Sequence, residues 1–188
     1  MEAALPVYLG ALHWVGDLMA DVPERSLSAP TPCAEFDVRS LSGHLLGTAE
    51  RSLGAAQGRS TREIPHVITN VSDAMLARRF RRLVEHIGPA WSAIQANEPI
   101  TAPWGRYPAI DVVRGFTIET LVHGWDLAVA TGQPSEAPAG LAATVEGFVD
   151  QVIPQATRKR MYDEPRASAD DAEPTERLAN ALGRESPV

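Results

Sequence analysis

The sequence predicts an all-α protein, a bundle of helices around one core, and two observations point to it. Apolar residues recur at steps of three and four along several stretches, whereas no stretch alternates for long between apolar and polar residues as a strand does. The chain has 188 residues, of which 44% are hydrophobic and 22% are charged. A chain of this length and balance can form one globular domain whose core needs no disulfide to hold it. We therefore expect four or five amphipathic helices packed against one another.

Local signals place these helices in order along the chain. Asp37 and Ser72 are suitable N-caps for the second and third helices, and Gly132 followed by Pro134 ends the fourth. The Gly-Pro pair at residues 88–89 is expected to kink or break the third helix. The stretches with an apolar stripe at helical spacing are residues 5–19, 38–53, 73–87, 112–130 and 141–152, and residues 174–182 are expected to form a last short helix.

The segments between the helices are rich in Gly, Pro and polar residues. Residues 54–65 are expected to form a loop, and residues 101–108, with the sequence TAPWGRYP, are expected to form a turn. Residues 158–174 are polar and contain prolines, which is typical of a surface segment or a flexible arm. We therefore divide the chain into a helix-bundle domain, residues 1–157, and residues 158–188, a surface segment with a short C-terminal helix that packs on the bundle or trails from it.

Composition argues against several classes of function. The 17 Lys and Arg residues against 24 Asp and Glu residues give a net charge of −7, which disfavours a nucleic-acid-binding surface. Cys33 is the single cysteine, so an intrachain disulfide and a Cys-rich zinc site are excluded. No apolar run reaches the roughly 18 residues of a membrane span, and the first residues lack the basic region of a signal peptide. We expect a cytoplasmic monomer or homodimer that binds neither nucleic acid nor membrane.

Three polar side chains lie within the apolar stripes. Glu119 and His123 are one helical turn apart on the inner face of the fourth helix, and His44 faces inward from the second. A carboxylate in an apolar interior is costly unless something compensates its charge. Two imidazoles and a carboxylate are ligands for zinc or another divalent metal such as Ni²⁺ or Fe²⁺, and three protein ligands leave the open position of a catalytic metal. The alternative is that each histidine is an ordinary hydrogen-bonded core residue.

Other titratable residues have weaker claims to a role. Asp126 lies three residues after His123, where it would orient that imidazole, bond to backbone or an arginine, or act as a general base. Cys33 precedes a helix and could be a nucleophile with His44 as its base, although His44 serves better as a ligand. His66 lies in a loop without a partner pattern, so we expect no role for it.

Three motifs resemble a known family. They are PTPCAEFDVRSL at residues 30–41 with His44 following, ETLVHGWDLA at residues 119–128, and, more weakly, LANALGR at residues 178–184. These motifs resemble the mycothiol-dependent maleylpyruvate isomerase N-terminal domain, which belongs to the DinB-like superfamily of metal-binding four-helix bundles. The resemblance implies a DinB-like four-helix bundle with up-down-down-up topology, to which the sequence adds a short C-terminal helix. It also implies His44, Glu119 and His123 as zinc ligands.

The resemblance further implies a reaction with a low-molecular-weight thiol such as mycothiol as cosubstrate. A thiol that coordinates a metal is deprotonated and becomes a nucleophile toward an electrophilic substrate. This predicts a metal-dependent thiol S-transferase or a thiol-assisted isomerase. Trp104 and Arg106, in the loop before the fourth helix, would contact the sugar of the thiol or a substrate carboxylate, unless they only anchor that loop.

Two other functions stay open at this point. One is a non-catalytic, metal-binding protein of stress response or protein interaction, because fold does not fix function. The other is a metallohydrolase that uses metal-bound hydroxide, with Asp126 as the nearest candidate general base.

Overall fold

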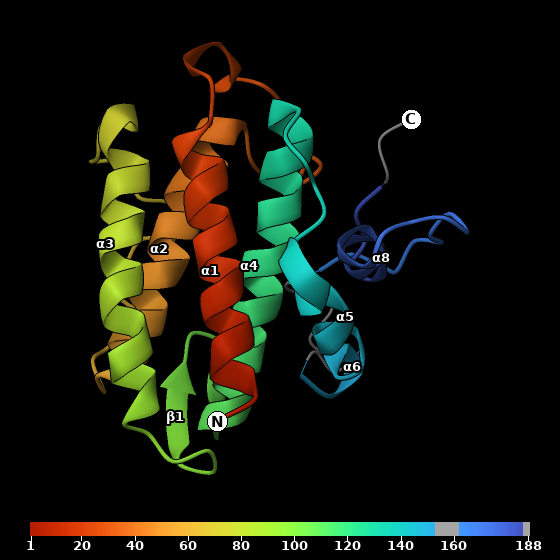
Figure 1. Cartoon of the computed structure of the whole chain (residues 1–188). Coiled ribbons are helices and arrows are strands. Elements are labelled where there is room, and N and C mark those ends of the chain that lie inside the picture. Colours follow the sequence, from red (N-terminus) through yellow and green to blue (C-terminus); the bar gives the residue numbers. More distant parts are fainter. Residues whose placement is uncertain (153–161, 186–188) are drawn as a thin grey trace.

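The computed structural model describes residues 1–152 and 162–185 and has the architecture of a four-helix bundle (Figure 1). The four long helices are α1 (Ala4–Ala20), α2 (Val38–Ala56), α3 (Asp73–Ser92) and α4 (Ala109–Thr131). In Figure 1, α1 runs up, α2 and α3 both run down, and α4 runs up again. Both α1 and α2 pack against α3 and α4. The all-α prediction and the up-down-down-up order are confirmed.

Several shorter elements complete the described chain. They are η1 (Glu24–Ser26), β1 (Pro99–Ala102), β2 (Gly105–Pro108), η2 (Pro138–Gly140), α5 (Leu141–Glu146), α6 (Val149–Val152) and α8 (Pro174–Ala181). The turn predicted at residues 101–108 is therefore wrong in part, because β1 and β2 form an antiparallel hairpin that pairs Pro99 with Pro108. Strands of four residues are too short to display a convincing alternation in sequence.

The capping signals mark the helix ends with one exception. The side chain of Asp37 accepts a 2.7 Å hydrogen bond from the backbone N–H of Ser40 at the start of α2. Gly132 follows α4 with a φ of 69°, the left-handed conformation that favours glycine at this position. Ser72 precedes α3 as expected, but its hydroxyl makes no capping hydrogen bond.

Two helix boundaries differ from the predictions. α3 continues through Pro89 to Ser92, so the helix is not broken there. The proline removes one backbone hydrogen bond, while the buried side chains of Ile87 and Trp91 on either side hold this stretch on the core. The predicted fifth helix is instead two short helices, α5 and α6, separated by Gly147 and Phe148. The predicted loop from residue 54 begins later, because α2 extends to Ala56.

The C-terminal segment returns to the bundle. α8 packs against α4 and α5, and Figure 1 shows it to the right of α4, level with the middle of that helix. Most residues from Asp163 to Asp171 are exposed, as predicted for a surface segment, but Tyr162 is buried. The predicted arm at residues 158–161 lies outside the described residues.

Aromatic and small residues bring the helices into close contact. Trp91, Trp125, Tyr8, Phe80 and Phe116 are among the largest fully buried side chains. Gly124 allows α1 and α4 to approach closely, because a Cβ atom there would lie 2.5 Å from the ring of Trp14. Trp125 of α4 is 1% exposed and packs in the core.

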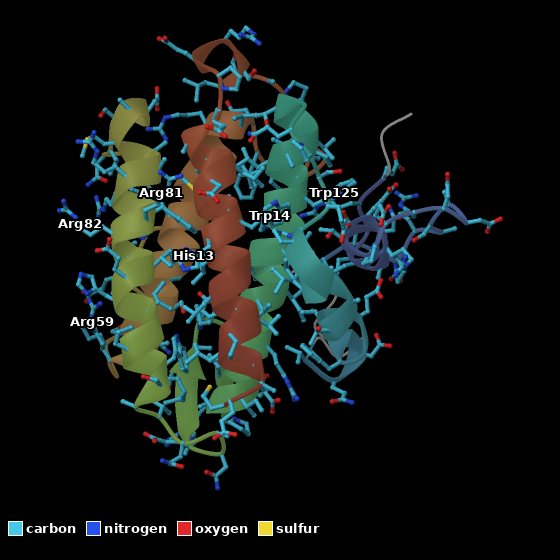
Figure 2. The ribbon with its side chains drawn as sticks, viewed as in Figure 1. His13, Trp14, Arg59, Arg81, Arg82 and Trp125 are labelled. Atoms are coloured by element: carbon cyan, nitrogen blue, oxygen red, sulfur yellow. The ribbon has the colours of Figure 1, made fainter. Side chains whose placement is uncertain are left out.

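The outer face of α3 is polar and basic. Arg78, Arg79, Arg81 and Arg82 are all exposed, and Figure 2 shows Arg82 on the outer side of α3 and Arg81 between α3 and α1. Arg81 pairs with Asp17 of α1 at 2.8 Å, so these arginines form a solvated face. Among the described residues, no helix combines the length and the apolar character that crossing a membrane requires.

Candidate metal centre

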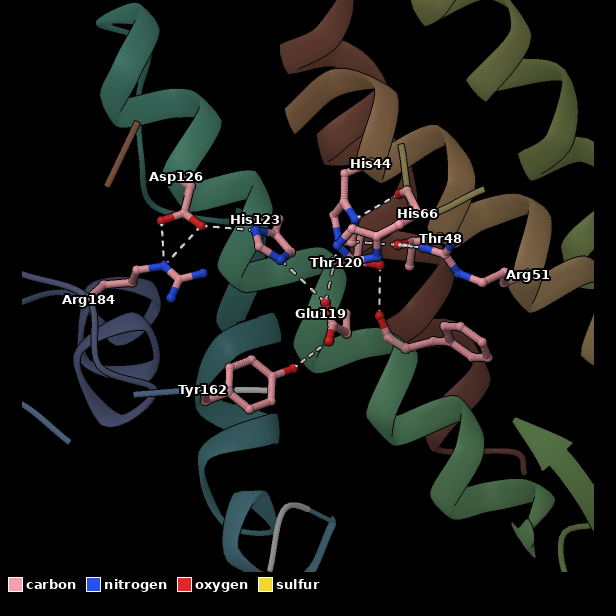
Figure 3. A network of polar contacts seen from close by, with 11 residues as sticks. His44, Thr48, Arg51, His66, Glu119, Thr120, His123, Asp126, Tyr162 and Arg184 are labelled. Atoms are coloured by element: carbon pink, nitrogen blue, oxygen red, sulfur yellow. Dashed lines mark hydrogen bonds and ion pairs between the residues drawn. The ribbon is translucent and has the colours of Figure 1, made fainter. Parts of the chain in front are cut away.

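The side chains of His44, Glu119 and His123 meet between α2 and α4 (Figure 3). One nitrogen or oxygen atom from each lies within 4.8 Å of the others. Glu119 Oε2 is 3.4 Å from Nε2 of His123 and 3.8 Å from Nε2 of His44. Both distances exceed a charge-assisted hydrogen bond of about 2.7–2.9 Å. They are close to the roughly 3.3 Å between donor atoms in a tetrahedral site with bonds of about 2.0–2.1 Å. The three donors could therefore hold one small divalent cation.

Both imidazoles are oriented by a hydrogen bond on the far side of the ring. His44 Nδ1 is 3.1 Å from the backbone oxygen of His66, and His123 Nδ1 is 3.0 Å from Oδ2 of Asp126. With Nδ1–H donating in each case, Nε2 of each ring faces Glu119 and can bind a cation once it carries no proton. This is the tautomer that a metal ligand needs. Asp126 thus lies behind His123, in the orienting position that its spacing allows.

The C-terminal segment contacts the candidate ligand Glu119 directly and the candidate ligand His123 through Asp126. Arg184 Nε donates to both oxygens of Asp126, at 2.9 Å and 3.1 Å. The hydroxyl of Tyr162 donates to Oε1 of Glu119 at 2.8 Å, which leaves Oε2 directed toward the imidazoles. Asp126 is completely buried and Arg184 is 7% exposed, so this ion pair is shielded from water. Tyr162 and Arg184 therefore help to orient two of the three candidate ligands, Glu119 directly and His123 through Asp126.

Burial and the neighbouring charges shift the pKa values of Glu119, His123 and His44 and so determine which of them carries a proton. Burial would raise the pKa of Glu119, but the neighbouring imidazoles of His123 and His44 hold it well below its usual value. Burial would lower the pKa of His123, but Asp126 and Glu119 raise it to about 9. Burial lowers the pKa of His44, and Glu119 offsets only part of that effect. At neutral pH the metal-free cluster therefore holds a carboxylate, an imidazolium and a neutral imidazole, so a proton on His123 occupies the place of a cation.

Comparison with known proteins identifies the family. Residues 11–128 match the mycothiol maleylpyruvate isomerase N-terminal domain, which is more than half of the chain. The chain belongs to this family. Two relatives are the uncharacterized proteins MT0763 and Rv0738 of Mycobacterium tuberculosis, strains CDC 1551 and H37Rv. Each is 26% identical over 170 residues, which cover 89% of this chain and 90% of the relative. No solved structure gives a significant match.

The part of the chain that matches the mycothiol maleylpyruvate isomerase N-terminal domain contains His44, Glu119, His123 and Asp126. Tyr162 and Arg184 lie beyond its last matched residue. The hydrogen bonds from Tyr162 to Glu119 and from Arg184 to Asp126 therefore join the matched domain to residues outside it.

Two cavities border the cluster, and His44, His66 and Glu119 line both of them. The first, of about 320 Å³, is also lined by Cys33, Tyr162 and Arg184. The second, of about 440 Å³, is also lined by Arg51, Thr61 and Trp104. Arg106 is exposed on β2 and is not among the residues that line either cavity.

Cys33 lies close enough to His123 and Asp126 for the three to form a second group of donors within 4.8 Å. Burial raises the pKa of its thiol, with Arg184 opposing. A thiol with a raised pKa is a poor nucleophile, and the Nδ1 atom of His44 is already bonded to His66. The geometry gives no support to a Cys33–His44 pair.

Several residues of the site escaped the sequence analysis. His66, for which we expected no role, orients His44 through its carbonyl, and its ring centroid is 4.5 Å from that of His44. Arg51, Tyr162 and Arg184 also contact the site or line its cavities. For Arg51, position offered a signal: it follows His44 by seven residues, two turns along the same face of α2.

Proposed function

We propose that the protein is a metal-dependent thiol S-transferase or thiol-assisted isomerase that uses a low-molecular-weight thiol such as mycothiol. The observation that carries the proposal is the convergence of His44, Glu119 and His123 within 4.8 Å in a member of a mycothiol-linked family. Two imidazoles and one carboxylate are the donor set of catalytic zinc in several enzymes, and three protein ligands leave room for a substrate atom.

His44, Glu119 and His123 would hold the cation, with zinc as the first choice because these donors suit it. A cation there supplies Lewis acidity, which lowers the pKa of a coordinating thiol. The surrounding groups orient the three ligands. Asp126 accepts a hydrogen bond from the Nδ1–H of His123, and the backbone carbonyl of His66 accepts one from the Nδ1–H of His44. Tyr162 donates a hydrogen bond to Oε1 of Glu119, which leaves Oε2 for the cation.

The two cavities suit a reaction with two substrates, because a thiol and an electrophile need separate approaches to one point. In an S-transfer, the sulfur–carbon bond forms while the bond from that carbon to its leaving group breaks, and the thiol proton departs with the leaving group. In an isomerisation, the thiol adds across a carbon–carbon double bond and is eliminated after rotation, so the thiol is regenerated.

The proposal is tested by thiol consumption. Zinc-loaded protein is incubated with mycothiol and a panel of electrophiles that includes alkyl halides, epoxides and activated alkenes, and free thiol and product are measured. The protein is expected to exceed the His44→Ala variant, whereas His86→Ala, which changes an exposed histidine of α3, should match the parent. Equal rates for the parent and His44→Ala across the panel and in alkene isomerisation would refute the proposal.

The metallohydrolase alternative has less support. Both oxygens of Asp126 are bonded, to His123 and to Arg184, and the side chain is completely buried. A carboxylate so engaged is a poor general base. Ester hydrolysis without thiol, lost in the His44→Ala variant, would favour the alternative.

A further inference from the structure

Two cavities meet at the end of the bundle where α1 ends and α3 begins. The first, here called the apolar cavity, has a volume of about 340 Å³ and is lined by the buried side chains of Met19 and Leu76. The second, here called the arginine groove, has a volume of about 510 Å³ and follows α3. Ala20, Ala74 and Ala77 line both, so the two are neighbours. They share no lining residue with the two cavities of the candidate metal centre.

Most of the residues that line the apolar cavity have apolar side chains. Val22 and Leu27, both half-buried, lie in its wall with the buried residues named above. Two exposed carboxylates also line it, and one of them, Asp73, is paired with Arg39. The other belongs to Glu24. The volume is at the lower end of the range for small-molecule sites, so the cavity suits a short apolar chain.

The arginine groove carries an excess of positive charge. Three arginines line it, against the single carboxylate of Glu85. Arg81 is paired with Asp17 at 2.8 Å, whereas Arg78 and Arg82 form no ion pair with another described residue. In Figure 2, Arg81 extends between α3 and α1, and Arg82 extends from the outer side of α3. Two unpaired guanidinium groups beside an apolar cavity favour a ligand that has an anionic head and an apolar chain.

We infer that these cavities bind a free fatty acid of medium length, with its chain in the apolar cavity and its carboxylate on Arg78 and Arg82. Each methylene group that leaves water adds to the affinity, and a carboxylate matches a guanidinium in shape and in charge. Glu24 lines only the apolar cavity and repels a carboxylate, so it directs the anionic head toward the groove. This site goes beyond the proposed function and does not depend on it.

The test follows octanoate binding to the full-length protein through the methyl signal of Met19 in an NMR spectrum, assigned with a Met19→Leu variant. Octanoate is expected to move this signal saturably. Propanoate has the same carboxylate and five methylene groups fewer, so it is expected to bind at least about a hundredfold more weakly. No movement of the signal with octanoate, or an equal affinity for the two acids, would overturn the inference.

A double variant locates the anionic head. Arg78→Gln with Arg82→Gln is expected to weaken octanoate binding at least about threefold and to leave the binding of octan-1-ol unchanged, because only octanoate is charged. Circular dichroism confirms that the variant folds. Arg59→Gln with Arg166→Gln is the matched control, since it removes the same charge at exposed positions that line neither cavity. Equal octanoate affinities in the two double variants, or an equal loss for octan-1-ol, would overturn the inference.

A third variant locates the chain. Ala77→Leu places a larger side chain where the two cavities meet, and leucine is also a good helix former. It is expected to weaken octanoate binding at least about tenfold, and an unchanged affinity would overturn the inference.

Two controls separate this site from other binding. Octanoate binding that persists in zinc-free protein and in His44→Ala supports the inference even if no thiol reaction is found. Binding that is lost in both would assign octanoate to the candidate metal centre and overturn the inference, with the thiol reaction left to its own test. Sedimentation with phosphatidylglycerol vesicles, without any effect of octanoate on Met19, would assign the arginines to a membrane surface and overturn it too.

Discussion

Replacing Arg184 by Gln is expected to destabilise the protein and to weaken its binding of zinc. Arg184 donates to both oxygens of Asp126, and Asp126 in turn holds the Nδ1–H of His123. The variant removes the positive charge and leaves the carboxylate of Asp126 buried with the imidazole as its remaining charged partner. The effect should therefore reach the candidate metal centre through one intermediate side chain.

The structure sets the size of the effect. Removing one partner of a buried ion pair costs about 3–5 kcal/mol of unfolding free energy. A Gln at this position can return one neutral hydrogen bond worth about 1 kcal/mol. We expect a net loss of about 3 kcal/mol, which lowers the Tm of a chain of this size by about 6–12 °C. Loss of a group that orients a ligand weakens metal binding by about ten- to a hundredfold.

Two measurements check this prediction against a matched control. Urea unfolding of the metal-free protein gives the stability difference, and competition with a chelator gives the zinc affinity. Arg166→Gln is the control, since it makes the same substitution in the same tail but at an exposed pair with Glu185, worth about 0–1 kcal/mol. If Arg184→Gln matched Arg166→Gln in both measurements, the proposed link from the tail to the metal would be wrong.

Three further predictions concern the same core. The pKa of His123 is raised to about 9, so a proton competes with the metal below that pH. Zinc affinity should therefore rise up to about tenfold per pH unit between pH 6 and 8. A zinc affinity that does not change with pH in chelator competition would contradict this. Gly124→Ala should lower the unfolding free energy, measured in urea, by about 1–3 kcal/mol, because the new Cβ would overlap the ring of Trp14. Unchanged stability would show that α1 and α4 can move apart without a cost in free energy. Phe116→Ala should cost about 3–5 kcal/mol in the metal-free protein, more than His44→Ala, and the reverse order in melting curves would assign His44 a structural role.

The four long helices could be predicted because each carries a long apolar stripe, and three of them also have a signal at one end. Asp37 and Gly132 mark ends that the structure also has. The hairpin of β1 and β2 was missed because its strands have four residues each. Pro89 misled the prediction for α3, since local chain stiffness was weighed without the tertiary contacts that hold the helix.

The candidate site was accessible from sequence only where helical spacing determines direction. Glu119 and His123 are one turn apart, and His44 sits within the apolar stripe of α2, so all three were expected to face inward. Their binding of a metal stays a prediction. Tyr162 and Arg184 contact residues 43 and 58 positions away in sequence, and no local pattern reveals such contacts. The hydrogen bond from His44 to the carbonyl of His66 could not be predicted either, because every residue has a backbone oxygen and the sequence does not show which one is used.

The most direct test of the central claim is the metal content of the purified protein and of its Glu119→Ala variant. Both are exchanged against zinc, freed of excess metal and measured by elemental analysis, with circular dichroism to confirm that the variant folds. We predict about one divalent ion per chain in the parent, as a single three-ligand site requires, and little in the variant. An equal metal content in the two proteins, or none in the parent, would contradict the account.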